Sequence, residues 1–152
     1  APIGGGGLFA GTCVAMKALR PEAMVLGVEP VGGASMSAAI DAGEVVTLDA
    51  THSVADGLLP VRAGELTYAH IRELADGVVT VEDEAIREAT RRLFTDHHLV
   101  VEFSGGATTA ALLSGAVDVA GRRIAVILSG GNMDPALLAD LVDQSEPARA
   151  RA

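Results

Sequence analysis

Residues 2–8 read PIGGGGL and lead directly into LFAGTCVAMKAL at residues 8–19. Four consecutive glycines leave the backbone N–H groups unshielded and tolerate a positive φ. The Ala-, Leu- and Met-rich stretch predicts a helix that ends before Arg20-Pro21. Loop amides together with the positive end of a helix dipole form a cradle for an anion, most often phosphate. The alternative is a flexible tail or a tight turn.

The glycine loop differs from the two common nucleotide loops. A P-loop carries Lys directly after its last glycine, whereas Leu8 follows here. A dinucleotide fold carries an acidic residue about 20 positions further on at a strand end, and only Glu29 stands near such a place. The dinucleotide interpretation is therefore the weaker one.

Beyond the loop, short apolar runs alternate with helical stretches. Strands are predicted at 24–28, 78–81 and 123–128, and helices at 35–42, 66–75, 82–97, 107–113 and after Asp134-Pro135. This alternation predicts an α/β fold, with a mostly parallel sheet flanked by helices. Ten of the 18 glycines form four clusters, at 4–7, 32–33, 105–106 and 130–131, which lie at the ends of predicted elements, where ligands of open α/β sheets bind.

Composition argues against several partners and settings. Lys and Arg number 11 against 20 Asp and Glu, and aromatic residues are 3%, so neither a basic groove nor a base-stacking platform for nucleic acid is expected. No apolar run reaches about 18 residues, which argues against a membrane span. The single Cys13 fits a reducing, cytoplasmic setting. The start at Ala1, without Met or signal peptide, suggests a processed end or a fragment.

Two further motifs are candidates for ligand contact. LSGGN at 128–132 follows a predicted buried strand, and its Ser129 hydroxyl can donate or accept a hydrogen bond. SVADG at 53–57 forms a polar turn. For each of them the alternative is a turn that simply needs glycine.

The motifs together resemble one family. PIGGGGL (2–8), GVEP (27–30), ADG (55–57), VVE (100–102) and LSGGN (128–132) have the order and spacing of the second half of the pyridoxal-phosphate (PLP) enzymes of the threonine dehydratase and serine racemase group. The resemblance runs from residue 2 to about residue 141. It implies that 1–144 is the C-terminal part of the PLP-binding large domain of a fold-type II (tryptophan synthase β-like) enzyme. Residues 145–152 are polar or small and are expected to form a frayed tail.

The resemblance also implies roles for individual residues. The phosphate of the cofactor would be held by Gly4, Gly5, Gly6, Gly7 and the amide of Leu8. Ser129 would hydrogen-bond the pyridine nitrogen, and as a neutral partner it would leave that nitrogen unprotonated. Gly57 would lie near the cofactor.

A divalent cation, Mg or Ca, is bound by some members of the family. Glu29 and the carbonyl of Gly33 match two of its ligands, but Ser35 stands where the third ligand is an acid. Because a hard cation prefers carboxylates, this replacement argues against metal binding. Glu102 is followed by Phe103, where the family usually has Pro.

The catalytic lysine of the family, which forms the Schiff base with PLP, has no counterpart in this chain. Its one lysine, Lys17, falls on the polar side of the predicted first helix and is interpreted as a solvated surface residue. We therefore expect the chain alone to be inactive. A missing N-terminal half, or a second chain, would carry the lysine, and the family implies a homodimer.

The activity that the resemblance implies is that of a threonine/serine dehydratase (ammonia-lyase). Such an enzyme converts a small β-hydroxy amino acid to a 2-oxo acid and ammonia. The absence of room for a C-terminal regulatory domain favours a catabolic-type or racemase-like member of the family. Alternatives are a serine racemase or hydroxyaspartate ammonia-lyase and, in another class, a non-catalytic fragment or subunit, or a phosphate-ligand binding module.

Overall fold

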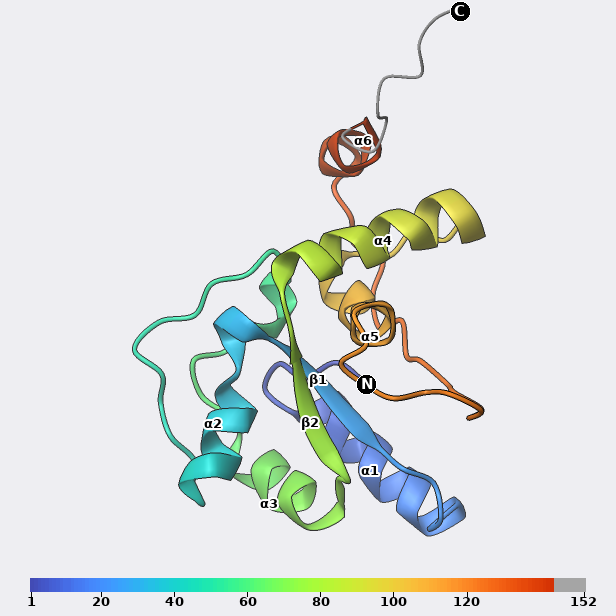
Figure 1. Ribbon diagram of the computed structural model, residues 1–152. Coiled ribbons are helices and arrows are strands. Elements are labelled where there is room, and N and C mark those ends of the chain that lie inside the picture. The colour runs from blue at the N-terminus through green and yellow to red at the C-terminus, as the bar shows by residue number, and fades with distance from the viewer. Residues whose placement is uncertain (144–152) are drawn as a thin grey trace, which may run out of the picture.

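The computed structural model describes residues 1–143 and has the predicted α/β organisation (Figure 1). The predicted tail at 145–152 lies outside the described residues. In chain order the elements are α1 (Gly7–Leu19), β1 (Leu26–Pro30), α2 (Ser35–Ala42), α3 (Glu65–Leu74), β2 (Gly77–Val81), α4 (Asp83–His97), α5 (Phe103–Leu113) and α6 (Pro135–Asp143), with short 3₁₀ turns at Val31–Gly33 and Asp56–Leu58.

The sheet is parallel, as predicted. β1 and β2 pair in register from Leu26 with Gly77 to Pro30 with Val81. On the other edge of β1, Pro2 forms a parallel bridge with Val28, and the Ile3 amide donates to the Val28 carbonyl at 2.8 Å. Four of the five β1 residues are buried, as expected for a strand covered on both faces.

Two apolar cores lie on the two sides of this sheet. In Figure 1, α4 and α5 lie on one side and α1 and α3 on the other. The first core joins α4 and α5 to the sheet and includes Val28, Val81, Ile86, Phe103 and Ala107. The second joins α1, α2 and α3 to its other face and includes Ile3, Phe9, Cys13, Met36 and Ile71. Because Pro2 pairs with Val28 in parallel, the glycine loop that follows Ile3 lies at the carboxyl end of β1.

Most predicted helices form within one or two residues of their expected ends, but α5 is longer. It begins at Phe103, four residues before the prediction at 107. Gly105 and Gly106 weaken the helical pattern in the sequence, but both are buried in the structure. A Cβ on Gly106 would lie 2.4 Å from Thr90 Oγ1 of α4, so the two helices approach too closely for a side chain there. Close packing therefore outweighs the low helix propensity of glycine.

The strand predicted at 123–128 is not formed. Between α5 and α6 the described chain contains no strand. The run has the apolar, β-branched composition of a strand, but a strand also needs a neighbour for its backbone hydrogen bonds. The backbone groups of Ile124, Ala125 and Val126 meet no partner within residues 1–143.

Helix α6 begins after Asp134 as predicted, and Asp134 caps it. Asp134 Oδ1 accepts hydrogen bonds from the amides of Ala136 at 2.7 Å and Leu137 at 3.4 Å. Across the part of the chain that the structure describes, no helix combines the length and the apolar composition required to cross a bilayer.

Candidate functional site

One side of the glycine loop packs against α3. Gly6 has φ 93°, the left-handed conformation that glycine adopts most easily, and the Ala10 amide donates to its carbonyl at 2.8 Å. Thr67 Oγ1 of α3 donates to the Gly5 carbonyl at 2.7 Å. A Cβ on Gly6 would lie 2.7 Å from the same Thr67 oxygen and 2.8 Å from Met36. Gly6 therefore has no room for a side chain.

The opposite side of the loop is open. A Cβ on Gly5 or Gly7 would have no atom within 4 Å, and both residues are exposed, as is Leu8. Within residues 1–143 no acceptor meets the amides of Gly7 and Leu8, which stand at the positive end of α1. Free amide donors without shielding side chains, at a helix N-terminus, fit the phosphate group of a ligand.

The ADG turn lies against this loop. A Cβ on Gly4 would be 2.8 Å from the Gly57 carbonyl oxygen, so the two backbones are in direct contact. The Gly57 amide donates to Ser104 Oγ of α5 at 3.0 Å. The structure thus brings together two of the motifs that the sequence singled out, Gly4–Gly7 and Gly57, and links them to the first turn of α5.

The turn that carries Ser129 lies against the same end of α5. The Glu102 amide donates to the Gly130 carbonyl at 3.1 Å, and a Cβ on Gly130 would overlap the Glu102 carboxylate. A Cβ on Gly105 would be 2.8 Å from the Gly130 oxygen. Ser129 itself is exposed, and its hydroxyl meets no partner in the described part of the chain. It is free to bond a ligand.

The first turn of α5 is therefore the link between the separate motifs, a role that the sequence analysis missed. Ser104 contacts Gly57, and Gly105 contacts Gly130. Thr67, which holds the glycine loop, was missed as well. The Gly105-Gly106 pair beside Glu102 was a usable signal, because paired glycines often mark a close backbone approach.

The predicted metal ligands lie at the N-terminus of α2. Glu29 is 0% exposed, and burial raises the pKa of its carboxyl group despite the hydrogen bonds that it accepts. Its oxygens accept from the Met36 amide at 2.8 Å, the Ser37 amide at 2.9 Å and Ser37 Oγ at 2.6 Å. The carboxylate thus caps α2, a structural role that does not need a cation.

The other two positions of the predicted metal set are also buried. A Cβ on Gly33 would lie 2.8 Å from Leu59, and the Ser35 hydroxyl meets no partner within residues 1–143. In the same part of the chain, no three His, Cys, Asp or Glu side chains are grouped as a metal site. The hydrogen bonds that Glu29 accepts from Met36 and Ser37 therefore account for its burial as a cap of α2.

Lys17 is partly buried and paired, not simply solvated. Its Nζ lies 2.7 Å from Asp76 Oδ2 and donates to the Ala23 carbonyl at 3.0 Å. Asp76 also accepts from the Val25 amide at 2.7 Å, and the hydrogen bond from Lys17 is the main reason that the pKa of Asp76 is lowered. The lysine therefore joins the loop after α1 to the turn before β2.

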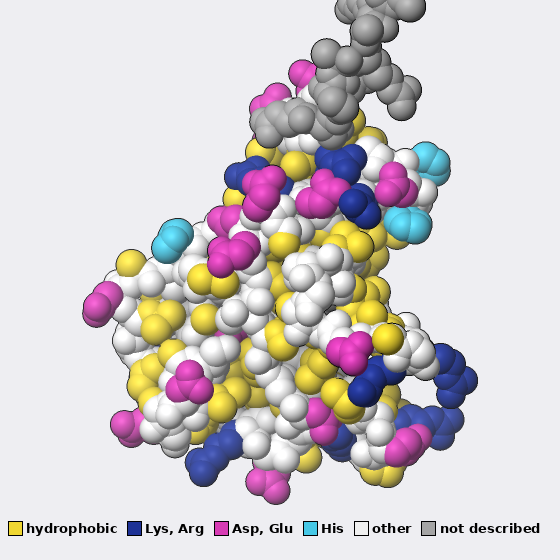
Figure 2. Space-filling model, in the orientation of Figure 1, with side chains coloured by type: hydrophobic (Ala, Val, Ile, Leu, Met, Phe, Trp, Pro, Cys, Tyr) yellow, Lys and Arg dark blue, Asp and Glu magenta, His cyan; other side chains and the backbone are white. Residues whose placement is uncertain are grey.

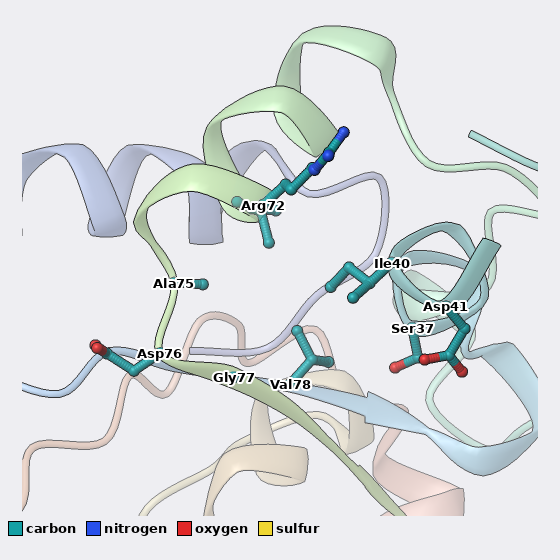
Figure 3. Close-up of a pocket in the computed structure, with 9 residues that line it drawn as sticks. Ser37, Ile40, Asp41, Arg72, Ala75, Asp76, Gly77 and Val78 are labelled. Carbon is teal, nitrogen blue, oxygen red and sulfur yellow. The ribbon is translucent and has the colours of Figure 1, made fainter. Parts of the chain in front are cut away.

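A separate pocket of 220 Å³ lies between α2, α3 and the start of β2 (Figure 3). Ile40 and Val78 lie across from each other in it, with Asp41 on α2 at one side and Arg72 on α3 at another. None of the residues that the motifs predict for the cofactor lines this pocket. The open glycine loop and the Ser129 turn are thus distinct from it.

Loop, turn and α5 define a class of protein. An open helix N-terminus whose glycine loop packs against the Gly57 turn, with a second glycine turn seated on α5, is typical of an α/β enzyme domain that holds a phosphate-bearing cofactor. The sequence model of pyridoxal-phosphate dependent enzymes matches residues 1–130. The chain belongs to this family, which confirms the resemblance.

Curated relatives agree with the family assignment. The catabolic L-threonine dehydratase TdcB of Escherichia coli K12 is 42% identical over 135 residues, covering 88% of this chain and 41% of the relative. The L-threonine ammonia-lyase of Thermotoga maritima is 33% identical, covering 94% and 35%. The serine racemase of Oryza sativa subsp. indica is 36% identical, covering 90% and 42%. The chain spans less than half the length of these relatives.

Solved structures of the family have the same fold. The T.th. threonine deaminase superposes with a TM-score of 0.82 at 42% identity, covering 88% of this chain and 45% of that one. Maize serine racemase gives a TM-score of 0.85 at 35% identity, covering 94% and 45%. The predicted fold-type II architecture is thereby confirmed.

Proposed function

We propose that this chain holds the phosphate and the pyridine ring of PLP in an enzyme that deaminates a small β-hydroxy amino acid, as a threonine/serine dehydratase. The observation that carries the proposal is the open glycine loop, whose unpaired Gly7 and Leu8 amides face outward at the start of α1. The contact between Gly4 and Gly57 and the packing of Gly130 on α5 support a single site.

Each predicted site residue is assigned to the phosphate or to the ring of the cofactor. The amides of residues 4–8 donate hydrogen bonds to the cofactor phosphate, and bonds of this charged type stabilise binding by about 1.5–3 kcal/mol each. Ser129 offers its free hydroxyl to the ring nitrogen, and Gly57 lies near the cofactor. The bound cofactor supplies the electron withdrawal that makes loss of the substrate α-proton feasible.

The proposed domain is 1–144, as the C-terminal part of the PLP-binding large domain. A lysine from a further part of the protein, or from a second chain, completes the site, because Lys17 is held by Asp76 and the Ala23 carbonyl. On this proposal the chain alone does not turn over substrate. Assembly as a homodimer and a cytoplasmic setting remain predictions.

The dehydratase interpretation is favoured by the names of the relatives. Besides the threonine enzymes, a phenylserine dehydratase of Ralstonia pickettii is 39% identical over 139 residues. The amino acids in these names, threonine and phenylserine, both carry a β-hydroxyl group. The rice serine racemase supports racemisation as the second candidate. Hydroxyaspartate as a substrate stays a prediction.

A cation at Glu29 and Gly33 also stays a prediction. To bind one, the Glu29 carboxylate would have to share its oxygens between the metal and the Met36 and Ser37 donors. Ser35 would supply a hydroxyl in place of a carboxylate, which is a weaker ligand for Mg²⁺ or Ca²⁺.

The test compares the same substitution at two positions, one in the glycine loop and one on α1. Gly5→Asp places a negative charge in the loop, and Gly11→Asp places it on α1, where a side chain also has no atom within 4 Å. We expect the PLP affinity of Gly5→Asp to fall at least about tenfold, which corresponds to about 1.4 kcal/mol. Gly11→Asp should bind nearly as the unaltered chain does. Equal affinities would remove the glycine loop from the proposal.

The alternative classes give different results in the same titration. A phosphate-ligand module would bind inorganic phosphate as tightly as PLP, because no contact to the ring contributes. Ser129→Ala then distinguishes them, since it weakens PLP binding only where the hydroxyl meets the ring.

A further inference from the structure

The turn that carries Gly57 lies in a long irregular connection. Residues 43–64, which join α2 to α3 and are all described, contain one 3₁₀ turn, Asp56–Leu58, and an isolated bridge between Thr47 and Arg62. Irregular stretches of this length are uncommon in compact domains and often serve a function. The Gly57 turn also touches the glycine loop. Because no helix or sheet ladder holds this turn, individual contacts must set its position.

Asp83, the first residue of α4, holds the start of this turn. Its carboxylate accepts hydrogen bonds from the Ser53 hydroxyl and from the Val54 amide, the latter at 3.1 Å. These donors precede Asp83 by 30 and 29 positions of sequence. Ser53 Oγ in turn accepts a hydrogen bond from the Ala55 amide at 3.1 Å. One carboxylate is therefore linked, directly or through Ser53, to three consecutive residues.

The contacts continue from this point to the glycine loop. Ala55 is buried, and its carbonyl accepts a hydrogen bond from the Leu58 amide at 2.9 Å, which closes the 3₁₀ turn. The Gly57 amide donates to Ser104 Oγ at 3.0 Å, and the Gly57 carbonyl lies against Gly4. A continuous path of contacts therefore leads from α4 through the turn to the loop.

The helix dipole alone does not account for these contacts. A carboxylate in the first turn of a helix is favourable without any partner. Glu84 is such a case, because it is exposed and has no partner within residues 1–143. Figure 2 shows acidic side chains gathered along α4 at the surface, interleaved with Lys and Arg. Asp83 is instead partly buried and accepts from two donors of another segment.

We propose that Asp83 is a positioning residue for the phosphate site. By holding Ser53 and Val54 it keeps the Gly57 turn seated against the glycine loop, and the loop amides then stay directed toward the cofactor phosphate. The inference rests on the proposed function and adds to it a residue that acts only through the turn. Hydrogen bonds to a carboxylate are stronger than those between neutral groups, so a single side chain can hold the turn.

The experiment compares two neutral substitutions in the first turn of α4, made in the full chain. Asp83→Asn keeps the size of the side chain but replaces one acceptor oxygen with an NH₂ group, so that either Ser53 or Val54 loses its acceptor. Glu84→Gln removes the same charge from the same turn without breaking a contact. We expect the PLP affinity to fall at least about threefold in Asp83→Asn and to stay unchanged in Glu84→Gln.

Two further readouts separate positioning from a general loss of stability. The phosphorus NMR signal of bound PLP reports the surroundings of the phosphate and not the free energy of unfolding. It should shift in Asp83→Asn and stay in place in Glu84→Gln. Without ligand, amide hydrogen exchange at residues 55–58 should be at least about threefold faster in Asp83→Asn, because the turn then opens more often.

Ser53 supplies a milder second pair, which also serves if Asp83→Asn fails to fold. Ser53→Ala deletes the hydroxyl that Asp83 holds, whereas Ser53→Thr keeps a hydroxyl at the same position. The bond from the Val54 amide to Asp83 is retained in both variants. We expect the alanine variant to show weaker PLP binding and a shifted phosphorus signal, and the threonine variant to behave as the unaltered chain does.

The possible failures are distinguishable. Equal PLP affinities and equal phosphorus signals in Asp83→Asn and Glu84→Gln would overturn the inference and leave the proposed function standing. Faster exchange at 55–58 with unchanged PLP binding would overturn it as well, because the turn would then move without any effect on the phosphate. An unaltered chain that binds no PLP would overturn the proposed function and, with it, the role of Asp83 at the phosphate.

Discussion

Gly105 and Gly130 are in backbone contact at the start of α5. A Cβ on Gly105 would lie 2.8 Å from the carbonyl oxygen of Gly130 and 3.1 Å from its amide nitrogen. The Glu102 amide donates to the same carbonyl at 3.1 Å. The turn that carries Ser129 is thus seated directly on the helix, at a distance that excludes a side chain.

Gly105→Ala should lower the free energy of unfolding by about 1–3 kcal/mol, because the new methyl group meets backbone that cannot move freely. This loss is expected even though alanine is the better helix former by about 1 kcal/mol. Gly11→Ala is the control, since a Cβ there has no atom within 4 Å. Urea unfolding measures both variants. If Gly105→Ala stabilised the protein as much as Gly11→Ala does, the contact between Gly105 and Gly130 would not be tight.

The extent to which sequence predicts this molecule depends on the range of the interactions. Local signals were sufficient for α2, which runs from Ser35 to Ala42 as predicted and ends at Gly43 in the left-handed conformation. They failed at 123–128, because a strand depends on a neighbour that no local pattern specifies. The segment at 123–128 therefore has the composition of a strand but forms none in the described chain.

The candidate site shows the same division. The glycine loop and the Ser129 turn were recognisable as motifs, but their connection was not. Ser104 and Thr67 act through hydrogen bonds to Gly57 and Gly5, across 47 and 62 positions of sequence. A lone Ser or Thr in a helix carries no sign of such a partner. The assigned ligand contacts themselves remain predictions.

Gly6→Ala and Gly5→Ala should separate folding from cofactor binding within one loop. Gly6 has φ 93° and faces Thr67 and Met36, so Gly6→Ala should cost at least about 1 kcal/mol of stability. Gly5 faces open space, and Gly5→Ala should change the free energy of unfolding by less than about 0.5 kcal/mol. Thermal unfolding without ligand, followed by PLP titration, measures the two effects separately. Similar stability losses would contradict the geometry of the loop.

Asp76→Asn should destabilise the protein near neutral pH by about 0.5–1 kcal/mol, the range expected for a partly exposed ion pair. The bond to Lys17 lowers the pKa of Asp76, so its contribution is complete above the ordinary aspartate pKa of about 3.9 and is lost as the pH falls through the lowered value. The difference between the two proteins should therefore shrink below about pH 4. Asp41→Asn is the control, as Asp41 is exposed and has no partner within residues 1–143.

Glu29→Gln should destabilise the chain by about 1–3 kcal/mol at pH 7, because an amide NH₂ would face the Met36 or Ser37 donors in place of a carboxylate oxygen. Burial raises the pKa of Glu29, so the folded state binds its proton more tightly than the unfolded state does. The contribution of Glu29 to stability therefore increases as the pH falls from neutral toward the ordinary glutamate value of about 4.3, and the glutamine variant lacks this increase. Urea unfolding at a series of pH values should show the gap between the two proteins widening on acidification. Glu44→Gln, at an exposed position without a partner in the described chain, should show neither effect. A glutamine variant as stable as the unaltered chain at every pH would mean that Glu29 does not cap α2 in solution.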